Sequence, residues 1–147
     1  MKVISFLNFK GGVGKTTSAH SIAAGLKMKG KKVLVIDMDP QGTLTFFSKG
    51  ERELNGDTRE ILFHEKTIGE AITNGEEFDF IGSNIKLATS ELLLNNGYNK
   101  EQKLKKAIDK MAKEYVYDFI LIDCPPSLSI FTLNALAAST DLIIPCE

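Results

Sequence analysis

The chain has 147 residues, of which 43% are hydrophobic, and it carries 18 basic against 19 acidic side chains. This length supports one hydrophobic core, so a single domain spanning residues 1–147 is expected. The formal net charge of −1 provides no overall basic field for nucleic acid, so such binding would require a local patch or residues that are not present here. The apolar run near Met1 is too short for a secretory signal, and no segment reaches membrane-spanning length.

Apolar runs with strand character alternate with helical patterns along the chain. The expected strands cover residues 3–9, 33–37, 78–82, 118–124 and 141–146. Several of these runs are nearly continuous in Val, Ile, Leu and Phe, as strands buried on both faces should be. This alternation is typical of an α/β fold with a mainly parallel sheet flanked by helices.

The first helix is expected between the first two strands. Ala19, Ala23 and Leu26 recur there at helical spacing, and Gly30 follows as a C-terminal cap. The basic run 27–32 then lies at the C-terminal end of this helix, where cations interact favourably with the helix dipole. That interpretation is favoured over a nucleic-acid patch.

Later segments carry helical and turn signals. Thr67 and Glu70 form a capping-box pattern that opens a short helix. Residues 100–115 have apolar side chains at helical spacing, and their lysines are most simply the solvated face. Ser127 or Ser129 caps a last helix over 131–138, whereas residues 47–60 are interpreted as a mobile surface connection. The apolar face of 100–115 consists of Leu104, Ile108, Met111 and Tyr115.

A glycine-rich turn follows the first strand and leads directly into the first helix. In a strand, turn and helix unit of this kind, backbone N–H groups and the positive helix end surround a phosphate. By the usual division of labour Lys15 reaches the β and γ phosphates, and the Thr16 hydroxyl binds Mg²⁺. The usual motif demands glycine at position 9, where this chain has Phe9. The expected phosphate-binding residues of the turn and the helix start are Gly11, Gly12, Val13, Gly14, Lys15, Thr16 and Thr17.

The segment KGGVGKTT resembles the deviant Walker-A P-loop ATPases of the ParA/MinD family. The resemblance implies ATP or ADP and Mg²⁺ as cofactors. It also gives Lys10 a role, because in that family the first lysine reaches across a nucleotide-sandwich dimer to the phosphates of the other subunit. A cation supplied in this way neutralises phosphate charge and makes hydrolysis depend on dimerisation. The alternative is that Lys10 only solvates the loop.

Acidic residues follow the second and fourth expected strands, at the edge where open α/β sheets bind ligands. One such carboxylate often only marks the start of a loop, but two beside a phosphate loop favour a site. Asp123 fits the Walker-B role, holding Mg²⁺ mainly through its water shell. The resemblance makes residues 37–42 and 123–129 two switches, in which Asp39 orients the attacking water and Asp37 supports the metal shell. The expected catalytic residues are thus Lys10, Lys15 and Asp39, and the metal site comprises Thr16, Asp37 and Asp123.

The segments DMDPQG and CPPSLS, with TLNAL after them, look like the partition ATPases of plasmids, phages and chromosomes. One departure is Thr43, where many of them have asparagine. The resemblance implies the sheet order 3-2-4-1-5, counted over the expected strands, and a family that continues beyond the fifth strand. The chain is therefore expected to be C-terminally incomplete.

The resemblance also implies a function. It predicts an ATP-binding and weakly hydrolysing molecular switch for DNA segregation, cytoplasmic, that acts as an ATP-bound homodimer with a centromere-binding, ParB-type partner protein. Non-specific DNA binding and membrane attachment are largely C-terminal properties in the family, so neither is claimed for this chain.

Two alternatives remain open. The chain is a truncated, hydrolysis-deficient fragment that acts by interaction, or it is a MinD-like or metal-cofactor assembly ATPase. The cofactor-assembly function would ideally show a cysteine pair placed for a shared cluster, which Cys124 and Cys146 lack. Both are interpreted as small buried hydrophobes in a reducing compartment. His20 and His64 are isolated and receive no role.

Overall fold

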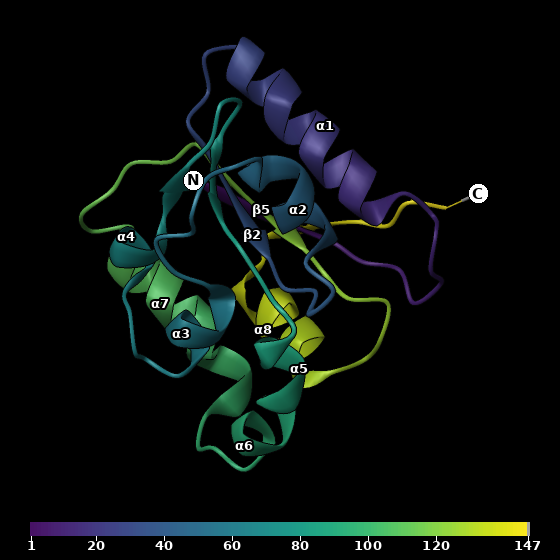
Figure 1. Cartoon of the computed structure of the whole chain (residues 1–147), viewed down its shortest axis with the longest axis vertical. Coiled ribbons are helices and arrows are strands. Elements are labelled where there is room, and N and C mark those ends of the chain that lie inside the picture. The colour runs from purple at the N-terminus through teal and green to yellow at the C-terminus, as the bar shows by residue number, and fades with distance from the viewer. Residues whose placement is uncertain (147) are drawn as a thin grey trace.

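Strands and helices alternate along the chain, and the strands form one sheet with helices on both faces (Figure 1). The computed structural model describes residues 1–146. The strands are β1 (Lys2–Phe6), β2 (Val33–Asp37), β3 (Thr73–Asn74), β4 (Asp79–Ile81), β5 (Phe119–Asp123) and β6 (Asp141–Ile143). The helices are α1 (Lys15–Met28), α2 (Thr43–Lys49), α3 (Thr58–Leu62), α4 (Ile68–Ala71), α5 (Lys86–Thr89), α6 (Glu91–Asn95), the 3-10 helix η1 (Lys100–Gln102), α7 (Lys103–Met111) and α8 (Ile130–Ala138).

The sheet has six strands in the order β3-β4-β2-β5-β1-β6. The five expected strands correspond to β1, β2, β4, β5 and β6, so the predicted order 3-2-4-1-5 is confirmed. Each neighbouring pair among these five is parallel, as expected of an α/β fold. β3 is an unpredicted addition that pairs antiparallel with β4. With two residues, it is too short to carry a recognisable apolar pattern.

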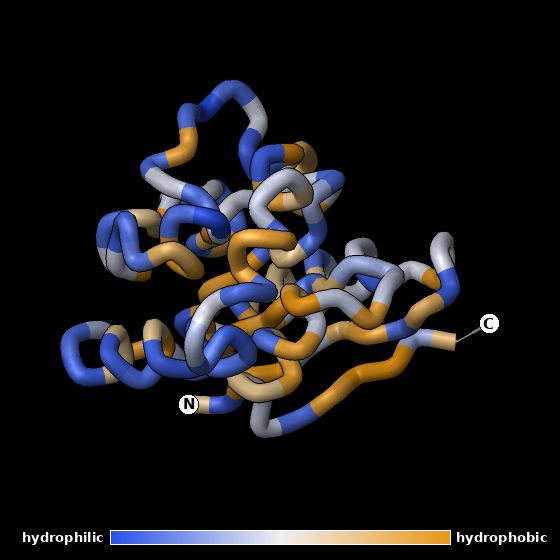
Figure 2. The backbone as a smooth tube through the Cα atoms, turned by 90° about the horizontal axis from the view of Figure 1, so that it is seen from below, coloured by the Kyte–Doolittle hydropathy of each residue, from blue (hydrophilic) through white to orange (hydrophobic). Residues whose placement is uncertain are grey.

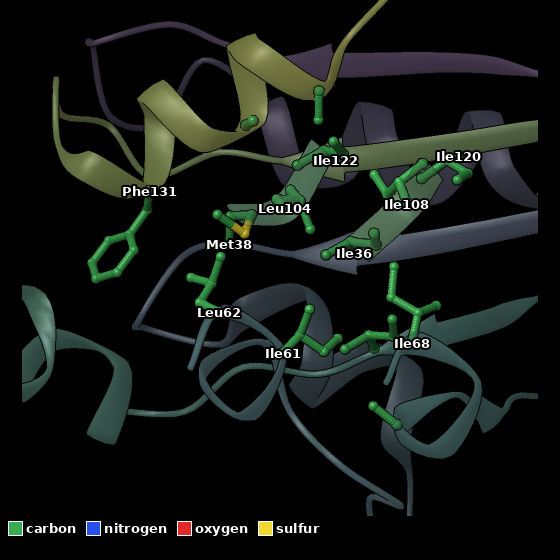
Figure 3. Packing of buried hydrophobic residues seen from close by; sticks show 14 of the residues in the cluster. Ile36, Met38, Ile61, Leu62, Ile68, Leu104, Ile108, Ile120, Ile122 and Phe131 are labelled. Carbon is green, nitrogen blue, oxygen red and sulfur yellow. The ribbon is translucent and has the colours of Figure 1, made fainter. Parts of the chain in front are cut away.

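Alternate residues of the central strands point to opposite faces of the sheet, and both faces are buried. On one face, Ile36, Ile120 and Ile122 pack with apolar residues of α3, α4, α7 and α8 (Figure 3). On the other face, Val35 and Leu121 belong to a smaller cluster beneath α1. In Figure 2 the apolar segments gather in the middle of the molecule and the hydrophilic ones at its periphery. Within residues 1–146, every helix lacks the length or the apolar character that a bilayer-spanning segment requires.

Capping residues set several helix ends as predicted. Gly30 follows α1 with a φ of 74°, the left-handed conformation of a C-terminal cap. Thr67 and Glu70 exchange the reciprocal hydrogen bonds of a capping box, which begins α4. Of the two serines before α8, Ser129 is the N-cap, and its hydroxyl accepts the N–H of Thr132 at 3.5 Å.

β1 is shorter than the predicted run 3–9 because Asn8 turns the chain out of the sheet. The Asn8 Oδ1 accepts the N–H of Lys10 at 2.9 Å, and its Nδ2 donates to the carbonyl oxygen of Pro145 at 2.7 Å. β6 also ends early, before Pro145, whose nitrogen has no hydrogen to donate. The start of the glycine-rich turn therefore lies beside the end of the described chain.

The interpretation of residues 47–60 as a surface connection is wrong at both ends. α2 extends into this segment, and α3 begins at Thr58 after a capping box that starts at Asp57. Thr58 is fully buried, and its hydroxyl donates to the carbonyl oxygens of Asp37 at 2.6 Å and Gly82 at 3.1 Å. A helix of five residues is too short to reveal itself by apolar spacing.

Two side chains lie outside the core to which the sequence assigned them. α7 ends at Met111, so Tyr115 lies beyond the helix and is 41% exposed, with its ring over Gly69. Cys124 is buried as predicted, but Cys146 is exposed because it lies beyond β6, the edge strand of the described sheet.

A buried amide joins α8 to the start of α7. Asn134 is fully buried on α8, and its Oδ1 accepts the N–H of Leu104 at 3.1 Å. Its Nδ2 donates to the carbonyl oxygens of Lys100 at 2.7 Å and Ile130 at 2.9 Å. The amide thus satisfies an N–H of the first turn of α7 that has no acceptor within its own helix.

We expect Asn134→Ala to lower the free energy of unfolding by about 2–3 kcal/mol, because it leaves buried backbone groups without partners. Urea denaturation of the variant measures the loss. Asn96→Ala, which removes an exposed amide of the same kind, is the control and should change stability by less than about 0.5 kcal/mol. Equal losses in the two variants would contradict the anchoring role of Asn134.

Candidate functional site

Three parallel strands end side by side at one edge of the sheet. Asp123, the last residue of β5, is in register with Phe6 of β1 and with Asp37 of β2. The glycine-rich turn follows β1, and the two acidic loops follow β2 and β5. The structure therefore brings together the segments that the sequence predicted to form a site.

The glycine-rich turn enters α1 through a left-handed backbone. Gly12 and Gly14 have φ values of 77° and 82°, which favour glycine, and Gly14 is the N-cap of α1. Val13 anchors the turn with 9% exposure, whereas Gly11 and Thr17 face solvent. Because Gly14 provides no side-chain acceptor, N–H groups of the first turn of α1 remain available for an anion.

The two lysines of the turn have different environments. Lys15 is only 7% exposed, and its Nζ donates to the backbone carbonyl oxygen of Lys10 at 3.2 Å. Lys10 is exposed. The Lys15 ammonium is therefore held over its own loop at the start of α1, where the glycine-rich motif predicts that phosphates bind.

A hydroxyl and a carboxylate meet beneath this loop. The Thr16 Oγ1 donates to Oδ2 of Asp123 at 2.6 Å. The other oxygen, Asp123 Oδ1, is buried and has no hydrogen-bond partner within residues 1–146. Such an oxygen needs a partner, and a hydrated cation provides donors of the right kind. The pair therefore fits a Mg²⁺ ion held by the Thr16 hydroxyl and, through water, by Asp123.

Burial controls the charge of the two strand-end carboxylates. Burial, together with the smaller effect of the nearby charges of Asp37 and Asp39, raises the pKa of Asp123 to about 7, although the hydrogen bond from Thr16 and the charge of Lys15 oppose the shift. Burial likewise raises the pKa of Asp37 to about 6, although hydrogen bonds from Thr45 and Asp39 oppose the shift. Both carboxylates are thus costly to ionise until a cation arrives.

Asp37 is fully buried and its carboxylate points toward protein donors. Oδ2 accepts the N–H of Thr45 at 2.9 Å and its hydroxyl at 2.6 Å, while Oδ1 accepts the N–H of Asp39 at 3.0 Å. Support of the metal shell by Asp37 would therefore act through charge and through the loop that it organises.

Asp39 lies in the loop between β2 and α2. Its Oδ1 accepts the N–H of Gln41 at 2.9 Å, and its carbonyl oxygen accepts the N–H of Gly42 at 2.9 Å. Gly42 has a φ of 63°, and a Cβ there would lie 3.0 Å from the carbonyl oxygen of Ser83. The loop is therefore a tight turn pressed against the end of β4.

Sequence reasoning missed the polar residues that support the site. Thr45, Thr58 and Ser83 each hydrogen-bond to Asp37 or to a residue that holds it. None of them belongs to a motif; Thr45 and Asp37 are 8 residues apart in the chain, Thr58 and Asp37 are 21 apart, and Ser83 and Thr45 are 38 apart. Asn8 was missed for the same reason, although an asparagine just before a glycine-rich turn is a turn signal.

The cysteines do not form a metal site. Burial raises the pKa of Cys124 to about 12, so its thiol stays protonated, and Cys146 is an exposed free thiol. No group of three or more His, Cys, Asp or Glu side chains within residues 1–146 is arranged to hold a metal.

Comparison with known proteins finds close relatives of the whole chain. A family model described as an AAA domain matches residues 1–147. The chain is 39% identical over 153 residues to the chromosome-partitioning ATPase Soj of Treponema pallidum, covering 99% of this chain and 57% of that protein. The chain therefore spans little more than half the length of this curated relative.

Solved structures match equally well. A cobyrinic acid a,c-diamide synthase of Mycobacterium smegmatis, with bound ATP analogue and magnesium, is 38% identical with a TM-score of 0.92, covering 99% of this chain and 60% of that one. A putative plasmid partition protein of Borrelia burgdorferi, bound to AMPPNP, is 37% identical with a TM-score of 0.85, covering 98% and 62% respectively.

The raised pKa values of Asp37 and Asp123 predict that the chain without ligand loses stability as pH rises from about 4 to 7. Each carboxyl is protonated more readily in the folded than in the unfolded chain, so its stabilising contribution is complete below its ordinary pKa of 3.8. That contribution falls by about 1.4 kcal/mol per pH unit until the raised pKa is reached.

Urea denaturation across this pH range measures the effect. Asp123→Asn should reduce the slope of the unfolding free energy against pH by the contribution of about one proton. Asp109→Asn, which changes an exposed carboxylate on α7, is the control and should keep the wild-type slope. A wild-type stability that rises over the same range would contradict the charge balance described here.

Proposed function

The chain belongs to the ParA/MinD-like family of P-loop ATPases, and we propose that it is a partition-type ATPase, an ATP-binding and weakly hydrolysing switch for DNA segregation. The observation that carries this proposal is the contact between Thr16 and Asp123, which leaves one buried carboxylate oxygen with no partner among residues 1–146, directly beneath the phosphate loop. Residues 1–147 would act as one P-loop ATPase domain.

Nucleotide binding is assigned to the turn and to the start of α1. The N–H groups around Gly12 and Gly14 would face the phosphates, and Lys15 would exchange its bond to the Lys10 carbonyl oxygen for a phosphate oxygen. Thr16 and Asp123 would hold Mg²⁺, and bound Mg²⁺ neutralises phosphate charge and orients the γ phosphate. The ATP analogue and magnesium bound to the Mycobacterium smegmatis relative support these cofactors.

Hydrolysis is assigned to Asp39 and to Lys10. Asp39 would orient a water in line with the γ phosphate; the P–O bond to ADP breaks as the water oxygen bonds to phosphorus, and its proton leaves with the phosphate product. Lys10 is exposed, and the family role would bring it to the phosphates of a second subunit. A cation supplied by the partner would make hydrolysis depend on an ATP-bound homodimer.

Partners and location are inferred from the family. A ParB-type centromere-binding protein would stimulate hydrolysis in the cytoplasm, and binding of non-specific DNA would depend on the whole protein, since the chain spans 57% of its Treponema pallidum relative. No membrane partner is proposed.

A second candidate function arises from the Mycobacterium smegmatis structure, which is named a cobyrinic acid a,c-diamide synthase. The likeness covers 60% of that chain, so it supports ATP and magnesium binding rather than one particular reaction.

Titration with labelled ATP and Mg²⁺, with molar mass followed by light scattering, tests the leading proposal. Tight binding with dimer formation supports it, whereas a chain that binds no ATP would instead be a fragment that acts by interaction.

We expect Lys15→Ala to weaken ATP binding by about a hundredfold, since it removes a charge-assisted hydrogen bond to phosphate. Lys10→Ala should keep ATP affinity within a few-fold but lose dimerisation and hydrolysis. Lys27→Ala removes another exposed lysine and serves as the control. Calorimetry, light scattering and phosphate release measure the three properties. If the Lys10 and Lys15 variants lose ATP affinity equally, the role of Lys10 in the other subunit is wrong.

We expect Asp39→Ala to retain ATP and the dimer while hydrolysis slows by roughly two to four orders of magnitude, because the water loses its orienting group. Binding should survive, since Lys15, Thr16 and the loop amides hold the phosphates independently. Phosphate release and dimer lifetime are measured in parallel, with Asp109→Ala as an exposed control on α7. A wild-type rate in the Asp39 variant would transfer the role to another residue, with Asp37 the first candidate.

A further inference from the structure

Thr45 occupies a buried position between Asp37 at the end of β2 and Ser83 just after β4. It lies in the first turn of α2 and is 5% exposed. Its hydroxyl donates to Oδ2 of Asp37 at 2.6 Å and accepts the N–H of Ser83 at 2.8 Å. A threonine hydroxyl has one proton to donate, so this proton is committed to Asp37.

The Asp37 carboxylate depends on these bonds. No Lys, Arg or His within residues 1–146 forms an ion pair with it, and burial opposes its ionisation. A buried carboxylate in this position is held by hydrogen bonds alone. Thr45 provides two of the three hydrogen bonds that reach the Asp37 carboxylate, one from its backbone N–H and one from its hydroxyl.

These bonds also close the loop that carries Asp39. One oxygen of Asp37 accepts the N–H of Asp39 at the start of the loop, and the other accepts from Thr45 just after its end. Ser83 ties the same hydroxyl to the end of β4, and the Ser83 carbonyl oxygen lies against Gly42. We call the hydrogen bonds that join Ser83, Thr45, Asp37 and Asp39 the Thr45 clip.

We propose that Thr45 is a positioning residue for ATP hydrolysis, which acts through Asp37 to hold Asp39 where it can orient the attacking water. This inference rests on the proposed function. Its physical basis is that Asp39 lies on a loop whose two ends are fixed to one carboxylate, and the Thr45 hydroxyl determines where that carboxylate points. A small displacement of a catalytic group is enough to cost about a hundredfold in rate.

Thr45→Val and Thr45→Ser separate the hydroxyl from the packing of the side chain. Valine keeps the shape of threonine and removes the hydroxyl, whereas serine keeps the hydroxyl and removes the methyl group. Thr73→Val is the matched control, because Thr73 is also a buried threonine whose hydroxyl accepts a backbone N–H, that of Asn55 at 3.0 Å, but it lies on β3.

We expect Thr45→Val to slow hydrolysis by about ten- to a hundredfold while ATP affinity changes less than about threefold. Thr45→Ser should restore the rate to within about threefold of the wild type, and Thr73→Val should leave it unchanged. Wild-type hydrolysis in folded Thr45→Val overturns the proposal. It is also overturned if serine is as slow as valine, because packing would then explain the loss, or if Thr73→Val is equally slow.

Amide hydrogen exchange of the chain without nucleotide tests the Thr45 clip independently of ATP. Thr45→Val should accelerate exchange at the N–H groups of Ser83 and Asp39 by about tenfold, which corresponds to the loss of about one hydrogen bond. Unchanged exchange overturns the inference even if the chain is an ATPase. Faster exchange in a chain whose wild type binds no ATP supports the Thr45 clip but overturns the proposed function and the catalytic role with it.

Discussion

Two buried carboxylates on neighbouring strands impose the main physical constraint on this molecule. Asp37 and Asp123 are in register at the ligand edge of the sheet, where burial raises the pKa of each and the charge of Asp37 further raises that of Asp123. Placing two such groups together is unfavourable unless cations offset them. Lys15 lowers the pKa of Asp123, and the Asp123 oxygen that has no partner among the described residues is suited to a hydrated cation. The phosphate loop and the acidic strand ends therefore form one electrostatic unit, in which Lys15 and the proposed Mg²⁺ would offset the negative charge of the carboxylates and of a bound phosphate.

Hydrogen bonds, rather than ion pairs, determine the shape of the first acidic loop. Asp37 holds both ends of it, Asp39 closes a turn within it, and Gly42 allows it to approach β4. The hydroxyl of Thr58 donates to the carbonyl oxygen of Asp37 and so fixes its backbone. Each of these bonds is short-range and directional, so the loop has a defined geometry without any bound ligand.

The second acidic loop, which follows β5, is connected to the helices that cover the sheet face opposite α1. The carbonyl oxygen of Ser127 accepts the Thr132 hydroxyl at 2.6 Å at the start of α8. Two residues further along α8, Asn134 binds the start of α7, and Phe131 and Leu104 belong to the same buried apolar cluster (Figure 3). The loop after β5, α8 and α7 are thus joined by continuous contacts, whereas the glycine-rich turn is joined to α1 on the other face.

The sequence by itself determined the features that depend on neighbours in the chain. Apolar runs predicted every parallel strand, Thr67 and Glu70 predicted a cap, and the glycine pattern with Lys15 predicted a phosphate loop whose φ values are those that glycine favours. The tertiary structure alone decided which polar groups meet. The bond between Thr45 and Ser83 and that between Asn134 and Leu104 join residues 38 and 30 positions apart, and no local pattern encodes such pairs. The reason is physical. The residues next to each other in the chain set the local backbone conformation, but the partner of a buried polar group is fixed only when the sheet register brings distant segments into contact.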